Sequence, residues 1–114
     1  TKEHGTARLI EGDLRQGMRV AVIDDVVTTG GSMIRAIRTI RSYGGDVVVA
    51  AAFIDREQGG LDAIKREGVN AVVLMRITEV INTLTKNGLI SDELRNSIIN
   101  YLVSTRVGAG AQTT

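Results

Sequence analysis

The residues with the clearest chemical potential lie in one short stretch, VIDDVVTTGGS at 22–32. Two adjacent carboxylates, Asp24 and Asp25, follow an apolar run, and hydroxyls and glycines come directly after them. Glycines let a backbone approach a ligand closely, and Thr and Ser hydroxyls add hydrogen-bond donors. If a helix begins here, its first N–H groups lack partners within the helix, and its dipole favours an anion. The pattern therefore predicts a loop that binds a phosphate group.

The two aspartates require a ligand that offers more than a phosphate. A carboxylate repels a phosphate dianion, but it accepts hydrogen bonds well from neutral hydroxyl groups. A ribose 5-phosphate unit has both features, with a phosphate for the loop and a diol for Asp24 and Asp25. Three or four hydrogen bonds to the phosphate, at about 1.5–3 kcal/mol each, would support binding on the micromolar scale.

Other interpretations of this stretch explain less of it. A Gly-Gly pair before a helix is often only a turn, and an Asp-Asp pair at the end of a strand can be plain solvated charge. A phospho-receiver domain also has an acidic pair, but it needs an acceptor aspartate two βα units later, and Asp55 comes one unit later. A P-loop would have Gly-Lys-Ser or Gly-Lys-Thr after its glycines, whereas this chain continues with Ser-Met. The full combination favours a binding site over a turn.

The composition of the whole chain is typical of one soluble globular domain. The chain has 114 residues, a net charge of +1, 43% apolar residues and 24% charged residues. This charge balance does not indicate a nucleic-acid partner, and the lack of cysteine excludes disulfides and thiolate metal sites. The longest apolar run, 47–54, is too short to span a membrane. A cytoplasmic location without membrane partners is the default expectation.

Strands and helices alternate along the chain as a parallel sheet requires. Apolar runs rich in Val and Ile predict strands. Segments with apolar residues at helical spacing, followed by a glycine, predict helices. The predicted strands lie at 19–24, 46–55 and 70–75, and the predicted helices at 32–43, 60–67 and 78–87, with a fourth after residue 91. Consecutive βαβ units imply an α/β fold with right-handed crossovers.

Two finer expectations concern the third and fourth helices and the middle strand. Thr78 and Ser91 are the predicted N-caps of the last two helices, because a hydroxyl there accepts from the first backbone N–H groups. The run 46–55 is apolar without alternation, which predicts a strand that is covered on both faces.

The ends of the chain indicate a piece of a longer protein. Residues 1–5, TKEHG, read like the middle of a polar loop, and three strands make a thin sheet with exposed edges. We therefore expect the parent protein to have further strands on the N-terminal side. Residues 1–103 are predicted to form part of a core domain, and residues 104–114, which are small and polar, a disordered tail.

The stretch 22–32 resembles the phosphoribosyl-diphosphate signature of the type I phosphoribosyltransferases, a hydrophobic run followed by two acidic residues and a Thr/Gly-rich loop. The resemblance implies the Rossmann-like parallel sheet of that family. It also implies Mg²⁺, held mainly by diphosphate and ribose oxygens of the substrate rather than by protein ligands. In the family, the acidic pair binds the ribose hydroxyls and the loop binds the 5-phosphate. The residues implied to contact the substrate are Asp24, Asp25, Val26, Val27, Thr28, Thr29, Gly30, Gly31 and Ser32.

Two further segments resemble the orotate phosphoribosyltransferases in particular. Lys2 and His4 match the end of a mobile catalytic loop, Lys-x-His-Gly. The resemblance implies that they act with the acidic pair as catalytic residues and reach the diphosphate, usually across a homodimer. Residues 55–60, DREQGG, match a stretch whose arginine contacts orotate, which assigns Arg56 to the substrate's base. A guanidinium is a good bidentate partner for the orotate carboxylate.

The expected function is therefore that of an orotate phosphoribosyltransferase. Orotate and 5-phosphoribosyl diphosphate would give orotidine 5′-phosphate and diphosphate, with Mg²⁺ and without nucleic acid. The resemblance runs from Lys2 to about Leu102 and matches only the C-terminal part of the family pattern. Two alternatives remain: a regulator on the same fold that senses phosphoribosyl diphosphate, and a purine phosphoribosyltransferase.

Overall fold

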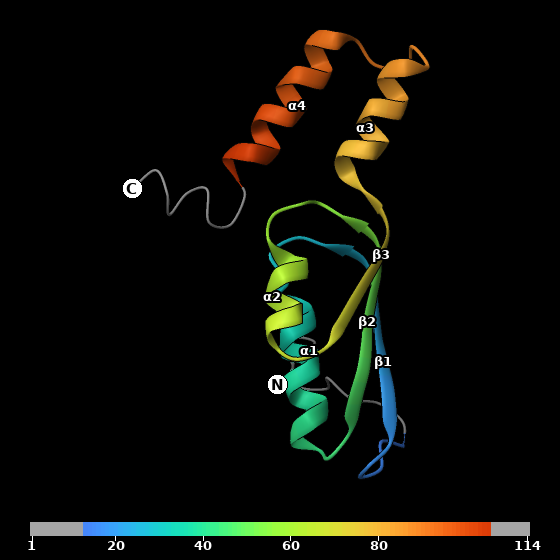
Figure 1. The fold of residues 1–114 in the computed structure, drawn as a ribbon, viewed down its shortest axis with the longest axis vertical. Helices are drawn as coiled ribbons and strands as arrows, with labels where there is room; N and C mark the ends of the chain where they lie inside the picture. Colours follow the sequence, from blue (N-terminus) through green and yellow to red (C-terminus); the bar gives the residue numbers. More distant parts are fainter. Residues whose placement is uncertain (1–12, 106–114) are drawn as a thin grey trace.

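The structure, a computed structural model, describes residues 13–105 and has three strands in one parallel sheet, in the order β1-β2-β3 (Figure 1). The elements in chain order are β1 (Arg19–Val27), α1 (Gly31–Ser42), β2 (Asp46–Asp55), α2 (Gly60–Arg66), β3 (Asn70–Arg76), α3 (Ile77–Lys86) and α4 (Asp92–Ser104). The predicted α/β order and parallel sheet are confirmed. No helix in this part of the chain is both long enough and apolar enough to cross a membrane.

The first strand is longer than the sequence indicated. β1 continues to Val27, so that Asp25, Val26 and Val27, which follow the predicted strand 19–24, belong to it as well. The reason is pairing, because Asp24 aligns with Ala52 of β2, and Val27 aligns with Asp55. A neighbouring strand supplies the hydrogen bonds of this backbone whether or not the side chains are charged.

Of the two predicted N-caps, one is confirmed and the other is wrong. Ser91 caps α4 as expected, because its hydroxyl accepts from the Leu94 N–H at 3.1 Å. The prediction for Thr78 is wrong, since α3 already begins at Ile77 and its N-cap is Arg76. Instead, the Glu79 carboxylate accepts from the Arg76 N–H at 2.9 Å. The N-terminal end of α3 is thus stabilised by a carboxylate from within its first turn, and not by a hydroxyl at the N-cap position.

The core lies between one face of the sheet and the helices α1 and α2, which pack together on that face (Figure 1). Met33 and Ile37 of α1 are buried, as their helical spacing predicts. Ile37 and Ile64 have no exposed surface, and the small side chains of Ala50 and Ala52 let the helices come close to β2. The buried cluster comprises Val27, Met33, Ile37, Val47, Ala50, Ala52, Ile64 and Val69.

The opposite face of the sheet is apolar and exposed in the described residues. Its large side chains and their exposed fractions are Ile23 (72%), Phe53 (57%), Val72 (53%) and Leu74 (70%). The prediction that 46–55 is covered on both faces is therefore wrong for this part of the chain. The reason is topological, because two crossovers of the same hand that run in the same direction across the sheet place both helices on one side. A contiguous apolar patch of this kind marks an interaction surface.

A lysine in this patch is expected to lower the fluorescence of an apolar-surface dye bound to the chain. Leu74→Lys places a charge among apolar neighbours, and it should not unfold the protein because Leu74 is 70% exposed. Leu89→Lys is the matched control, because Leu89 is also 70% exposed but lies in the α3–α4 connection. Equal dye binding by the two variants would show that the sheet face is not the exposed apolar surface.

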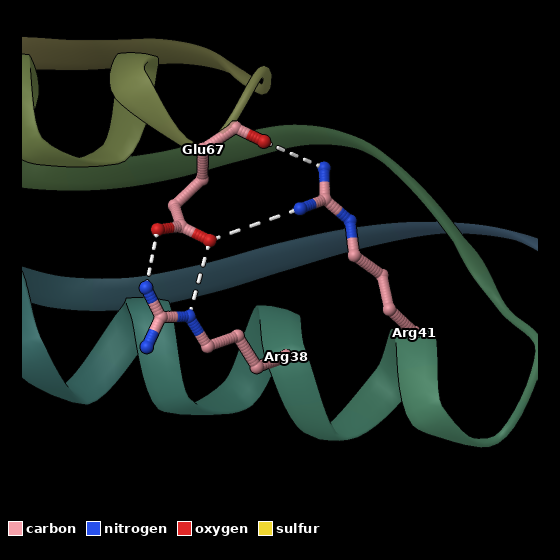
Figure 2. Close-up of polar contacts among 3 residues, drawn as sticks. All are labelled: Arg38, Arg41 and Glu67. Atoms are coloured by element: carbon pink, nitrogen blue, oxygen red, sulfur yellow. Dashed lines mark hydrogen bonds and ion pairs between the residues drawn. The ribbon is translucent and has the colours of Figure 1, made fainter.

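A bidentate ion pair joins α1 to the end of α2 (Figure 2). Arg38 donates from Nη2 to Glu67 Oε2 at 2.7 Å and from Nε to Oε1 at 3.2 Å. Arg41 donates from Nη2 to the Glu67 carbonyl oxygen at 2.8 Å. These contacts place cations at the C-terminal end of α2, where the helix dipole favours them. The hydrogen bonds from Arg38 lower the pKa of the Glu67 carboxyl below its ordinary value.

Glu67→Gln is expected to lower the melting temperature slightly at neutral pH, because exposed ion pairs contribute little to stability. The folded-state pKa of Glu67 is lowered, so its contribution is present above the ordinary value of 4.5 and is lost as pH falls through the folded-state value. The difference between the variant and the parent chain should therefore shrink in acid. Thermal melts across this range measure it, with Arg38→Gln as the reciprocal variant. A difference that persists in acid would assign the effect to packing.

Candidate phosphate and base site

The loop between β1 and α1 has the geometry of an anion site. Gly30 is the N-cap of α1 with φ 90°, and it provides no side-chain acceptor for the first N–H groups of the helix. The first turn of α1 also contains no acidic residue, so no carboxylate there repels an anion. Thr29 and Ser32 are exposed beside this turn. N–H groups, a favourable helix dipole and two accessible hydroxyls together suit a phosphate.

The two aspartates lie just before this loop, on neighbouring positions of β1. Successive side chains of a strand point to opposite faces, so Asp24 lies on the helix-covered face with its aligned partner Ala52, and Asp25 lies on the open face. Asp24 Oδ1 accepts from the Asp25 N–H at 2.8 Å. Asp24 is half-buried and Asp25 is exposed. Both residues thus precede the loop in the chain, but their carboxylates lie on different faces of the sheet and differ in exposure.

The two valines of the stretch, Val26 and Val27, differ in their exposure to solvent. Val27 is 2% exposed and its side chain belongs to the hydrophobic core. Its carbonyl oxygen accepts from the Arg56 N–H at 2.9 Å. Val26 is 36% exposed at the end of β1. Their proposed contact with the substrate stays a prediction, and for Val27 it would have to involve the backbone.

The segment that follows β2, residues 56–59, lies beside the loop, and hydrogen bonds to several parts of the chain fix it. Asp55 is 6% exposed, and its carboxylate accepts from the Glu57 N–H at 2.9 Å. Glu57 has a φ of 60° and accepts from the Thr78 N–H at 3.0 Å. Gln58, 7% exposed, donates to Thr105 Oγ1. The backbone on both sides of Arg56 is therefore fixed by buried polar groups.

The Arg56 guanidinium itself has no hydrogen-bond or ion-pair partner among residues 13–105. The side chain is half-buried, and its backbone N–H is bonded to the last residue of β1. A fixed backbone with an unpaired guanidinium is suited to bind a ligand carboxylate. The backbone of Arg56 thus lies next to the last residue of β1, directly before the loop, and its contact with a base stays a prediction.

A polar pocket of about 340 Å³ adjoins this segment on the side of β3. Its lining combines carboxylates with Lys65 and Arg76. The acidic side chains Asp55, Glu57 and Asp62 make it a poor site for an anionic sugar phosphate. The β1–α1 loop remains the better candidate.

The predicted site also includes Lys2, His4 and a bound Mg²⁺. Lys2 and His4 lie outside the described residues. Between residues 13 and 105, no three His, Cys, Asp or Glu side chains are placed to hold a metal ion together. The oxygen donors of Asp24 and Asp25 nevertheless suit Mg²⁺, which keeps several waters and binds through one or two carboxylates plus substrate phosphates.

Sequence reasoning missed the residues that hold the site in place. Asp55 and Gln58 are buried polar groups, and Glu57 adopts a left-handed backbone conformation that a non-glycine residue rarely shows. The contacts of Gln58 with Thr105 and of Glu57 with Thr78 join residues far apart along the chain, so neither contact has a local sequence signal. The pair of glycines at 59–60 was the one available hint of a close backbone approach.

Comparison with known proteins assigns the chain to a family. The Phosphoribosyl transferase domain family matches residues 6–73. An orotate phosphoribosyltransferase of Staphylothermus marinus is 46% identical over 101 residues, which are 89% of this chain and 49% of the relative. The chain spans about half the length of the curated relatives it matches.

Two solved structures share the fold. The UMP synthase of Leishmania donovani matches 82% of this chain and 21% of its own, with a TM-score of 0.75 and 26% identity. The orotate phosphoribosyltransferase of Mycobacterium tuberculosis in complex with 5-phospho-α-D-ribosyl 1-diphosphate matches 58% of this chain and 41% of its own, with a TM-score of 0.55 and 36% identity. The predicted fold class is thereby confirmed, and with the family match over 6–73 it follows that the chain belongs to the phosphoribosyltransferase family.

Proposed function

We propose that this chain is part of an orotate phosphoribosyltransferase, which forms orotidine 5′-phosphate and diphosphate in pyrimidine nucleotide biosynthesis. The observation that carries the proposal is the adjacency of two subsites. The unpaired guanidinium of Arg56 sits on a segment whose N–H bonds to Val27, directly before the phosphate loop. A sugar phosphate on the loop and an anionic base at Arg56 would therefore meet at the ribose C1 atom. The names of the similar proteins support orotate as that base.

In this proposal the β1–α1 loop binds the 5-phosphate of phosphoribosyl diphosphate. N–H groups of the first turn of α1 and the hydroxyls of Thr29 and Ser32 donate to the phosphate oxygens, and Thr28 lies near the base. Asp24 and Asp25 accept from the ribose hydroxyls. Each charged hydrogen bond of this kind contributes about 1.5–3 kcal/mol. The sugar is thereby held in one orientation toward the base, which is the main requirement for attack at C1.

The reaction itself needs no protein nucleophile. As the bond from C1 to the diphosphate breaks, positive charge develops on the ribose and negative charge on the leaving group. Lys2 and His4 are proposed to stabilise the diphosphate, since positioned cations act where charge develops in the transition state. Mg²⁺, when bound, would neutralise diphosphate charge next to Asp24 and Asp25. Because Lys2 and His4 act in a neighbouring subunit's site in the family, we propose a homodimer, and a cytoplasmic one, since both substrates are charged metabolites.

The proposal is tested by assaying the full-length protein for release of diphosphate from phosphoribosyl diphosphate and Mg²⁺. Orotate, adenine and guanine are supplied in parallel reactions. Release that depends on orotate alone is the expected result. Turnover of a purine without turnover of orotate would identify a purine phosphoribosyltransferase. Binding of phosphoribosyl diphosphate without turnover of any base, accompanied by altered binding to nucleic acid, would identify a regulator.

A further inference from the structure

Gly60, the first residue of α2, touches the phosphate loop backbone to backbone. A Cβ atom added to Gly60 would overlap Val27 Cγ1, and it would lie 2.6 Å from the Thr28 carbonyl oxygen and 3.0 Å from the Gly30 nitrogen. The contact is reciprocal, because a Cβ added to Gly30 would lie 3.0 Å from the Gly60 carbonyl oxygen and 3.2 Å from its Cα. No side chain fits between these two segments.

The requirement for glycine at position 60 is one of space. The φ angle of Gly60 lies outside the left-handed region, unlike that of Gly30 at 90°. Alanine could therefore adopt the same backbone conformation at position 60, and only its methyl group would be in conflict. This makes Gly60→Ala a clean steric probe of the contact.

The group that must move in response to that methyl is the loop. Val27 is 2% exposed and packed in the core, and its carbonyl oxygen is bonded to the Arg56 N–H at 2.9 Å. The backbone at 28–30 lies beyond the strand, with Thr29 exposed to solvent. A methyl group on Gly60 would therefore displace Thr28 and Gly30, and with them the N–H groups that begin α1.

We propose that Gly60 is a positioning residue, which sets the phosphate loop at a fixed distance from the segment that carries Arg56. This inference rests on the proposed function and adds that the sugar-phosphate and base subsites are aligned through one backbone contact between α2 and the loop. Gly60 touches neither substrate in this proposal. It acts through Thr28 and Gly30, which do.

The test compares Gly60→Ala with Gly45→Ala in the full-length protein. Gly45 is a matched control because its φ is also outside the left-handed region and an added Cβ would lie 2.6 Å from Ile40 Cγ2. It precedes β2, at the end of the strand away from the site. Both variants should lose thermal stability. Only Gly60→Ala should raise the KM for phosphoribosyl diphosphate and the Kd for ribose 5-phosphate, by roughly tenfold to a hundredfold, with a much smaller change in the KM for orotate.

Equal effects of the two variants on the KM for phosphoribosyl diphosphate, or an unchanged KM in Gly60→Ala, would overturn the positioning role. If Gly60→Ala does not fold, the double variant Val27→Ala/Gly60→Ala removes the overlap with Val27 Cγ1 and is compared with Val27→Ala alone. Binding of ribose 5-phosphate separates this inference from the proposed function. If Gly60→Ala raises the Kd for ribose 5-phosphate in a protein that does not use orotate, the positioning role of Gly60 is retained. The proposed function is then rejected.

Discussion

Arg56→Ala is expected to lower kcat/KM for orotate by about 10²–10⁴-fold in the full-length protein. The guanidinium has no hydrogen-bond or ion-pair partner among residues 13–105. Its removal should therefore weaken binding of the substrate without destabilising the fold. Two charge-assisted hydrogen bonds to a carboxylate, at about 1.5–3 kcal/mol each, correspond to a loss of this size. The KM for phosphoribosyl diphosphate should change little, because the loop before α1 is intact. Steady-state kinetics with each substrate varied in turn measures both constants.

Two further variants sharpen this result. Arg56→Lys keeps the charge but cannot form the planar bidentate pair, so only part of the activity should return. Arg66→Ala removes an exposed arginine from the far end of α2 and should leave both constants unchanged. If Arg56→Ala kept the parental constants for orotate, the base subsite would have to lie elsewhere.

The double variant Asp24→Asn/Asp25→Asn is expected to lower kcat/KM for phosphoribosyl diphosphate by about 10²-fold or more. Asparagine preserves the size of the side chain but removes the charge, which weakens hydrogen bonds accepted from the ribose hydroxyls. The Mg²⁺ concentration needed for half-maximal activity should also rise, because two negative charges close to the substrate-bound Mg²⁺ are lost. Kinetics with varied phosphoribosyl diphosphate and varied Mg²⁺ measures both effects.

Asp46→Asn is the matched control for the acidic pair. Asp46 is an exposed carboxylate at the opposite end of the strands, at the start of β2. Its neutralisation changes the net charge in the same direction without touching the site. A similar loss of activity in Asp46→Asn would mean that overall charge, and not the acidic pair, supports binding of the substrate.

The sequence predicted the fold well where a local pattern decides the structure. Met33 and Ile37 recur at helical spacing, and both are buried against the sheet. The run at 46–55 forms β2 over those same residues, because Val, Ile and Ala fit a central strand on either face. Ser91 caps α4 through a hydroxyl contact that spans only three residues.

Features that depend on distant partners could not be predicted in this way. β1 continues beyond Asp24 to Val27 because β2 is there to pair with it. Phe53 and Leu74 are apolar in sequence, yet they lie on a face that no described helix covers. The contact of Gly60 with the phosphate loop joins segments about thirty residues apart, and nothing local to either glycine identifies its partner.

The decisive experiment on the phosphate site is a crystal structure of the full-length protein with ribose 5-phosphate and Mg²⁺. We expect the phosphate on the N–H groups at the start of α1, beside Thr29 and Ser32, with the ribose hydroxyls facing Asp24 and Asp25. Ligand bound at another place, with this loop empty, would contradict it.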